Sequence, residues 1–295
     1  MPTLFRERFA ITHYFNPVRY MRLLELVSGK ETSKKVVSKL ADFNDRHLGK
    51  GVVRCADTPG FLGNRVGVFA LQVGIDEAIN CRLSIEDADA LMGRPMGIPK
   101  TGVFGLYDLI GIDLMADVVK SLGSILPSDD AFHAVGKESS VITLMIKNGY
   151  TGNKGNGGFY KTNPDGVLHT LQLTGHTGEN LPSYAAAKQE LPELAVRAAV
   201  ASAKQKEPLV QILEGNTDHA KFCRRVLGRV LSYAASLIPT VTESPQDIDD
   251  AMKLGFNWQR GPFELMDAIG HSKMGELLEE AGLKVPDILQ LDQPF

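Results

Sequence analysis

An internal duplication constrains the fold of this chain more than any other feature of its sequence. Residues 85–92 and 245–252 share a pattern of acidic and apolar positions, and residues 102–111 and 261–270 share the pattern Gly-x-Phe-x-Leu-x-Asp-x-Ile-Gly. The two blocks recur at offsets of 160 and 159 residues. Two separate blocks at nearly the same offset indicate a repeated unit, and such units tend to pack against each other as the subunits of a dimer do.

Apolar residues follow helical periodicity in both copies of the duplication. The stretch between them is rich in glycine and proline and carries few apolar runs, which is typical of a connection. We therefore expect a first helical domain over residues 60–160, a loop-rich linker over 161–192 and a second helical repeat over 193–295.

The first 59 residues have a different pattern. Short apolar runs over residues 9–15, 20–27 and 51–55 predict strands, and helical spacing over 32–49 predicts one helix. Three or four such elements make a poor sheet by themselves. Residues 1–59 are therefore expected to be the C-terminal remnant of a larger α/β domain, and the whole chain is expected to be mostly α.

Composition excludes several classes of protein. The chain of 295 residues has 32 basic and 35 acidic residues, a net charge of −3, so no basic field attracts nucleic acid. No apolar run approaches the length of a membrane span, which predicts that the chain has none. Three scattered cysteines without a C-x-x-C pair favour a reducing, cytoplasmic location. The sequence contains no metal-binding motif, so we predict no metal site.

One histidine and one glutamate lie inside predicted strands. His13 falls within the run 9–15, and Glu25 lies twelve residues later in the next run. An ionisable side chain in a buried strand is costly unless it is paired, and strands this close in sequence are often neighbours. A carboxylate that accepts the imidazole N–H would set the tautomer and stabilise the imidazolium of a general base. On spacing alone, a purely structural buried pair explains the pattern equally well.

Two further segments carry candidate chemistry. A Pro-Gly turn at residues 59–60 leads into a long helix and places Asn64 in its first turns, where the amide either holds a substrate oxygen or simply caps the helix. The glycine cluster at 152–158 lacks the G-K-[ST] ending of a phosphate-binding loop, and Tyr160 stands where a third glycine would be needed. A plain turn is favoured there.

These residues together resemble the L-3-hydroxyacyl-CoA dehydrogenase family of fatty-acid β-oxidation. The resemblance rests on residues 13–17, on 22–27 with Glu25 and on 57–65 with Asn64. Residues 102–108 and 154–160 look like helical-domain segments of the family, although the glycine segment alone would be weak. The resemblance covers residues 5–160 well and the second repeat moderately. The chain also resembles the fused, multifunctional members of the family, which have two tandem helical domains. In those members the second copy takes the place of a dimer partner. The expected fold class is thus the tail of an α/β Rossmann domain followed by two repeated all-helical domains.

The resemblance implies a function for each matching residue. His13 would be the general base that takes the 3-hydroxyl proton of an (S)-3-hydroxyacyl-CoA while hydride leaves C3 for NAD, which yields the 3-ketoacyl-CoA. Glu25 would orient the imidazole, Asn64 would hold the substrate oxygens, and Asn16 would help to shape the pocket. An acyl-CoA substrate, an intramolecular pseudo-dimer of the two repeats and a further oligomer are the partners that it implies.

The sequence also departs from the family pattern. The G-x-G-x-x-G turn and the acidic ribose-binding residue of a Rossmann unit do not precede His13. We therefore expect a fragment in which most of the NAD site lies outside the chain. In the second repeat Arg224 stands at the position of Asn64, so that copy is expected to be structural.

Two alternative functions are also compatible with the sequence. A non-catalytic dimerisation or scaffold module derived from the family is compatible with the missing glycine-rich turn. A 3-hydroxy-acid dehydrogenase acting on a free acid would tend to use a lysine base, whereas a His–Glu unit points to the CoA thioester family. No enoyl-CoA hydratase segment is visible in the sequence.

Overall fold

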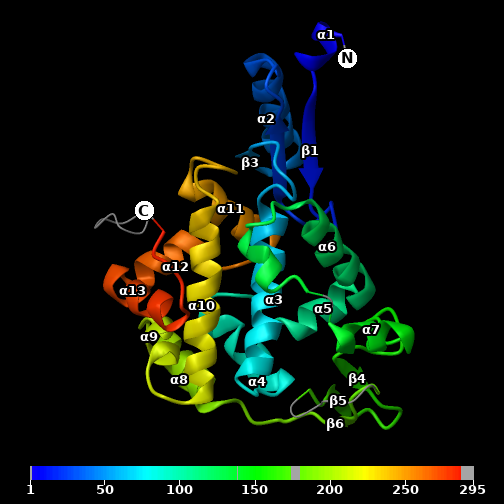
Figure 1. The fold of residues 1–295 in the computed structure, drawn as a ribbon, viewed down its shortest axis with the longest axis vertical. Coiled ribbons are helices and arrows are strands. Elements are labelled where there is room, and N and C mark those ends of the chain that lie inside the picture. The colour runs from blue at the N-terminus through cyan, green and yellow to red at the C-terminus, as the bar shows by residue number, and fades with distance from the viewer. Residues whose placement is uncertain (1, 138, 174–179, 287–295) are drawn as a thin grey trace. The chain divides into compact units, whose positions relative to one another are not determined.

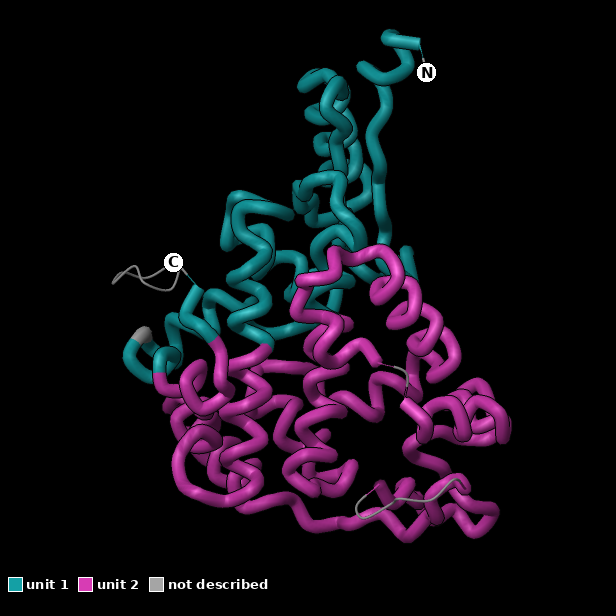
Figure 2. Tube along the Cα trace, in the orientation of Figure 1, with its two compact units in different colours: residues 1–67, 230–275, 284–295 teal, residues 68–229, 276–283 magenta. Residues whose placement is uncertain are grey.

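A computed structural model of the chain describes residues 2–137, 139–173 and 180–286. Part of the predicted linker (174–179) and the end of the predicted second repeat (287–295) lie outside the described residues. The chain divides into two compact units, the first made of residues 1–67, 230–275 and 284–295 and the second of 68–229 and 276–283 (Figure 2). The boundaries expected near residues 59, 160 and 192 concern the duplication along the sequence and stay predictions.

A three-stranded sheet forms the N-terminal part of the first unit, in the order β1-β2-β3 (Figure 1). β1 (Ala10–Tyr14) runs antiparallel to β2 (Leu23–Ser28), and β2 runs parallel to β3 (Gly51–Cys55) through the crossover helix α2 (Lys34–Leu48). Parallel neighbours joined by a helix are typical of an α/β sheet. The short helix α1 (Thr3–Arg6) precedes β1.

Alternation along the strands sends their side chains to two different partners. Tyr14 donates a hydrogen bond to Asn44 of α2, so the face that carries Tyr14 and its register partner Leu24 meets α2. Leu23 lies on the opposite face and packs against Gly255 at the end of α11 (Pro245–Gly255). The central strand β2 is therefore covered on both faces, and its first five residues are buried.

The duplication appears as four helices that recur in the same order. The first set is α3 (Gly63–Asn80), α4 (Ile85–Leu91), α5 (Phe104–Ile110) and α6 (Ile112–Ile125), and the second is α10 (Asp218–Ser236), α11, α12 (Pro262–Ile269) and α13 (His271–Glu280). The remaining helical segments are η1 (Arg94–Met96), η2 (Ala131–Ala134), α7 (Ser140–Lys147), α8 (Glu193–Ala203) and α9 (Pro208–Leu213). None of the described helices is both long and apolar enough to cross a bilayer.

Each copy holds its third helix with a buried aspartate. Asp89 of α4 accepts hydrogen bonds from the N–H groups that begin α5 and from one tyrosine hydroxyl, with donors Val103, Phe104, Gly105 and Tyr160. Asp249 of α11 accepts the corresponding N–H groups of Phe263 and Glu264 at the start of α12. The carboxylates thus satisfy donors that the helix itself leaves unpaired.

The conserved spacing of glycine in the two copies has the same cause. A Cβ on Gly102 would lie 2.5 Å from the Asp89 side chain, and one on Gly261 would overlap Asp249. Glycine is required at both positions because the aspartate approaches the backbone too closely for any side chain.

The predicted fold class, a Rossmann tail followed by two repeated all-helical domains, is wrong. Within the second unit, β4 (Tyr160–Thr162), β5 (Leu168–Leu171) and β6 (Tyr184–Ala186) form an antiparallel sheet where a linker was expected. Its first hairpin turns through Asn163-Pro164-Asp165-Gly166, with Gly166 at a φ of 82°. The second repeat does not form a helical domain of its own either, because α11 packs on β2 and β3 of the first unit.

The buried aspartates predict how the stability of the fold depends on pH. Burial raises the pKa of Asp89 to about 7 and that of Asp249 to about 6, although the N–H donors at the helix starts act in the opposite direction. The ordinary pKa of an aspartate is 3.8. Between pH 3.8 and about 7, these two carboxyls therefore bind more protons in the folded chain than in the unfolded chain. The free energy of unfolding should therefore fall as the pH rises through this window.

Urea unfolding at pH 5, 6, 7 and 8 measures this dependence. We expect the free energy of unfolding to decrease from pH 5 to pH 7 and to level off above it. A free energy that stays constant or rises over the same range would contradict the raised pKa values of the two carboxyls.

Candidate active site

His13 and Glu25 are direct register partners in neighbouring strands. The Nδ1 atom of His13 lies 2.6 Å from Oε2 of Glu25. The Glu25 side chain is fully buried, whereas the His13 side chain is 33% exposed. Because the partner is a carboxylate, Nδ1 carries the proton and donates it, and Nε2 is left as the acceptor of the ring.

The second oxygen of Glu25 is held by the start of α3. Oε1 accepts the N–H of Leu62 at 2.9 Å and the N–H of Gly63 at 2.7 Å. Both N–H groups belong to the unpaired donors of a helix N-terminus, where the helix dipole favours a negative charge. The carboxylate is thus buried with three hydrogen bonds, and it is oriented by two elements that are distant in sequence.

Aromatic rings fix the orientation of the imidazole. Phe15 lies edge-on to it with ring centroids 5.1 Å apart, and Phe61 lies 5.6 Å away in a tilted arrangement. The turn before α3 needs left-handed backbone at Gly60 (φ 75°) and Phe61 (φ 50°), which turns the Phe61 ring toward His13. The edge-on geometry is favourable for aromatic pairs and leaves the ring little freedom.

The two predicted asparagines lie at different depths. Asn64 is the second residue of α3, directly after Gly63, and is half-buried. No side-chain hydrogen bond within the described part of the chain holds it, so its amide is not used as a cap. Asn16 is exposed in the loop between β1 and β2.

Several contacts of this site were missed by reasoning from the sequence. The N–H groups of Leu62 and Gly63 were the unrecognised partners of Glu25, although a Pro-Gly turn before a helix is a signal that unpaired donors follow. Phe15 and Phe61 were not singled out, because aromatic residues in short apolar runs are ordinary core residues by pattern alone.

The corresponding position of the second repeat is occupied differently. Arg224, at the position of Asn64, is bonded to Glu280 and to the carbonyl oxygens of Leu213 and Gly215. The guanidinium therefore ties together parts of the second unit.

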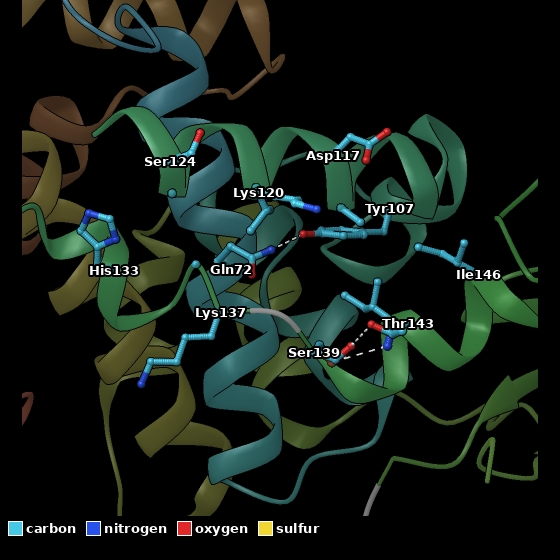
Figure 3. A pocket seen from close by; sticks show the side chains of 15 residues that line it. Gln72, Tyr107, Asp117, Lys120, Ser124, His133, Lys137, Ser139, Thr143 and Ile146 are labelled. Atoms are coloured by element: carbon cyan, nitrogen blue, oxygen red, sulfur yellow. Dashed lines mark hydrogen bonds between the residues drawn. The ribbon is translucent and has the colours of Figure 1, made fainter. Parts of the chain in front are cut away.

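The second unit also contains a cavity of about 580 Å³ (Figure 3). Its lining includes a buried pair, in which Gln72 donates to the hydroxyl of Tyr107, and the apolar side chains of Val119 and Ile146. Polar and charged side chains also line it, among them the half-buried His133 and the exposed Lys120. None of the four predicted site residues lines this cavity.

Comparison with known families gives matches along most of the chain. Residues 3–58 match the 3-hydroxyacyl-CoA dehydrogenase NAD binding domain, and residues 60–162 and 222–290 both match the C-terminal domain of the same family. The chain belongs to the 3-hydroxyacyl-CoA dehydrogenase family. The resemblance inferred from the motifs around His13 is thereby confirmed, and NAD is the cofactor that the family model indicates.

Relatives of known description agree with this assignment. A putative fatty acid oxidation complex trifunctional enzyme of Rickettsia prowazekii is 36% identical over 90% of this chain and 35% of its own length. A probable 3-hydroxyacyl-CoA dehydrogenase of Bacillus subtilis is 31% identical over 96% of this chain and 34% of its own length. The chain therefore spans about a third of the length of these relatives.

A solved structure completes the correction of the fold class. The 3-hydroxybutyryl-CoA dehydrogenase of Escherichia coli matches 96% of this chain and 70% of its own, with a TM-score of 0.61 and 24% identity. Sheet and helices of this chain thus follow one dehydrogenase fold, in place of a Rossmann tail with independent helical domains.

The turn between β2 and α2 is the place in the N-terminal sheet where a dinucleotide could bind. A dinucleotide pyrophosphate is bound by a glycine-rich turn between a strand and a helix N-terminus. In the described residues, the turn from β2 to α2 has Gly29 as its one glycine and ends in Ser33, whose hydroxyl caps α2. These residues do not fit a pyrophosphate.

Removal of the Glu25 carboxylate should destabilise the first unit. Glu25→Ala leaves two buried N–H groups and the His13 ring without their partner, and we expect a loss of about 3–5 kcal/mol in the free energy of unfolding. Glu25→Gln keeps an oxygen for Leu62 and Gly63 and should cost clearly less. Urea titrations of the two variants test this, and equal losses would show that the N–H contacts contribute little.

Proposed function

We propose that the chain carries the proton-transfer site of an enzyme that oxidises (S)-3-hydroxyacyl-CoA to 3-ketoacyl-CoA with NAD in fatty-acid β-oxidation. The observation that carries this proposal is the arrangement of His13, Glu25 and the start of α3, in which a partly exposed imidazole is backed by a buried, fully bonded carboxylate. The descriptions of the relatives support an acyl-CoA thioester as substrate.

His13 acts as the general base. With Nδ1–H donated to Glu25, the Nε2 lone pair of His13 takes the proton of the substrate 3-hydroxyl. NAD, when bound, would accept the hydride that C3 releases. The resulting imidazolium is stabilised by the carboxylate 2.6 Å away, which also accepts hydrogen bonds from two backbone N–H groups. In the reverse direction the imidazolium returns the proton to the 3-keto oxygen.

Asn64 and Asn16 contact the substrate in this proposal. Asn64 lies one residue beyond the N–H that binds Glu25, and its amide is free to donate to the 3-oxygen or the thioester oxygen. Asn16, three residues after His13 and exposed, shapes the entrance of the pocket. The helix start thus serves both the carboxylate and the substrate.

We also propose that the two repeats pair within the chain as subunits do in a dimer. Support comes from the second unit, where the fully buried Glu77 of α3 is bound by Arg225 and Arg229 of α10. Asp76 adds a second bond to Arg229, at 2.6 Å. These ion pairs join the first helix of one copy to the first helix of the other.

The function is tested by following NADH oxidation with acetoacetyl-CoA. The assay compares the enzyme purified from the cells that produce it (the cellular form) with the purified 295-residue chain. Activity in the cellular form supports the dehydrogenase. A cellular form that is folded but inactive would favour the alternative of a non-catalytic dimerisation module. The lack of a pyrophosphate cradle in the described residues is compatible with that alternative.

Replacement of the base should abolish most turnover. For His13→Gln we expect a loss on the order of 10²- to 10⁴-fold in kcat, because a general base contributes that much. Glu25→Gln should also lower kcat, because an amide beside Nδ1 no longer enforces the productive tautomer. Steady-state kinetics of both variants decide this, and near-normal turnover of His13→Gln would remove its assigned role.

The second repeat supplies the matched negative control. Arg224→Ala removes the residue at the position of Asn64, whereas Asn64→Ala removes the proposed substrate ligand. We expect kcat/KM to fall only for Asn64→Ala, with Arg224→Ala acting on thermal stability alone through its lost bonds to Glu280 and two carbonyl oxygens. A loss of turnover in folded Arg224→Ala would make the second copy catalytic.

A further inference from the structure

The second repeat contacts the aromatic residues that surround His13. Phe256, which caps the C-terminus of α11, has its ring 5.8 Å from that of Phe15 and at 70° to it. Phe15 in turn lies edge-on to the His13 imidazole at 5.1 Å. All three residues belong to the first unit, so these contacts lie within one compact body.

Two glycines of α3 make room for these rings. A Cβ on Gly63 would lie 2.7 Å from Cζ of Phe15, and a Cβ on Gly67 would overlap the ring of Phe256. The two glycines are four residues apart on α3 and therefore lie on the same face of the helix. Their missing side chains form a notch in which the Phe15 and Phe256 rings are seated side by side.

Phe256 is itself fixed by the end of its helix. Its N–H donates to the carbonyl oxygen of Met252 in α11, and the chain leaves the helix through Asn257 at a φ of 55°. The preceding Gly255 packs against Leu23 of β2, where a Cβ would come within 2.5 Å. The ring position therefore depends on how α11 docks on the sheet, and adjustment of the side chain alone cannot move it far.

We infer that Phe256, which the second repeat supplies, is a positioning residue for the His13–Glu25 pair. Gly63 joins two routes to the imidazole: its N–H binds Glu25, and its bare Cα receives Phe15, which Phe256 supports. One route fixes the Nδ1 end of the ring, and the other fixes its plane. The inference rests on the proposed function for its effect on turnover, but the ring position can be measured independently.

The orientation of the base matters because proton transfer requires a narrow geometry. A misplacement of about 1 Å at a catalytic group can cost on the order of 10²-fold in rate. Without the Phe256 ring, Phe15 can tilt toward the empty notch, and the imidazole loses its edge-on neighbour. Glu25 remains in place, because its backbone donors do not involve α11.

The experiment uses the 295-residue chain with ¹³C-labelled histidine. The His13 Cε1–H resonance, assigned by its loss in His13→Gln, reports the ring currents of Phe15 and Phe61. We expect Phe256→Ala to shift this resonance, with Phe256→Leu causing a smaller shift. Leu265→Ala is the control, because Leu265 is buried on α12 of the same repeat and its truncation weakens the repeat without emptying the notch.

Where Phe256→Ala fails to fold, Gly67→Ala takes its place. The new methyl group displaces the Phe256 ring while favouring the helix, so it should also shift the His13 resonance. A His13 resonance unchanged by Phe256→Ala, or by Gly67→Ala in its place, overturns the inference, as does an equal shift in Leu265→Ala.

Kinetics of the cellular enzyme separate this inference from the proposed function. We expect folded Phe256→Ala to lose about tenfold or more in kcat with KM for acetoacetyl-CoA changed little, because the base is misoriented while substrate contacts remain. A wild-type enzyme without activity would refute the function and leave the resonance shift to decide the positioning role. Full activity together with a shifted resonance would show that the ring position does not matter to turnover and would overturn the inference.

Discussion

The buried carboxylate of Glu25 is the interaction on which the first unit depends. It lies in the central strand, where a charge is tolerated only because His13 and two N–H groups at the start of α3 bind it. These three bonds join β1, β2 and α3, so one side chain connects the sheet to the first helix of the duplication. The same contacts that make its burial possible leave the imidazole with one defined tautomer. The contacts that stabilise the buried charge are therefore the same ones that orient the imidazole.

The duplication shows which contacts of the repeated unit are kept in both copies and which are not. Both copies retain the aspartate that binds the N-terminus of the third helix and the glycine that lets it approach, at Asp89 with Gly102 and at Asp249 with Gly261. The position of Asn64 is not retained, since Arg224 there is engaged in structural bonds. The second copy has kept its packing and contributes α11, whose end supports the aromatic residues beside His13.

Local patterns predicted the elements that depend on nearest neighbours in sequence. The three strands of the first sheet, the helix between them and the pairing partners His13 and Glu25 all follow from alternation and from the cost of burying a charge. The sheet at residues 160–186 was missed, although Asn163-Pro164-Asp165-Gly166 is a turn sequence, because its strands are only three or four residues long and have no apolar alternation. Short strands are stabilised by their neighbours, and no local pattern reports that.

The sequence by itself determined the family, the duplication and the pairing of His13 with Glu25, because each follows from a motif or a repeat that can be identified without distances. The substrate contact of Asn64 stays a prediction. Only the tertiary structure decided which donors hold Glu25, that Gly63 and Gly67 seat two aromatic rings, and that α11 packs on the sheet of the first unit. These contacts join residues up to more than two hundred positions apart. Their energies come from packing and hydrogen bonding between segments, which residue spacing along the chain does not encode.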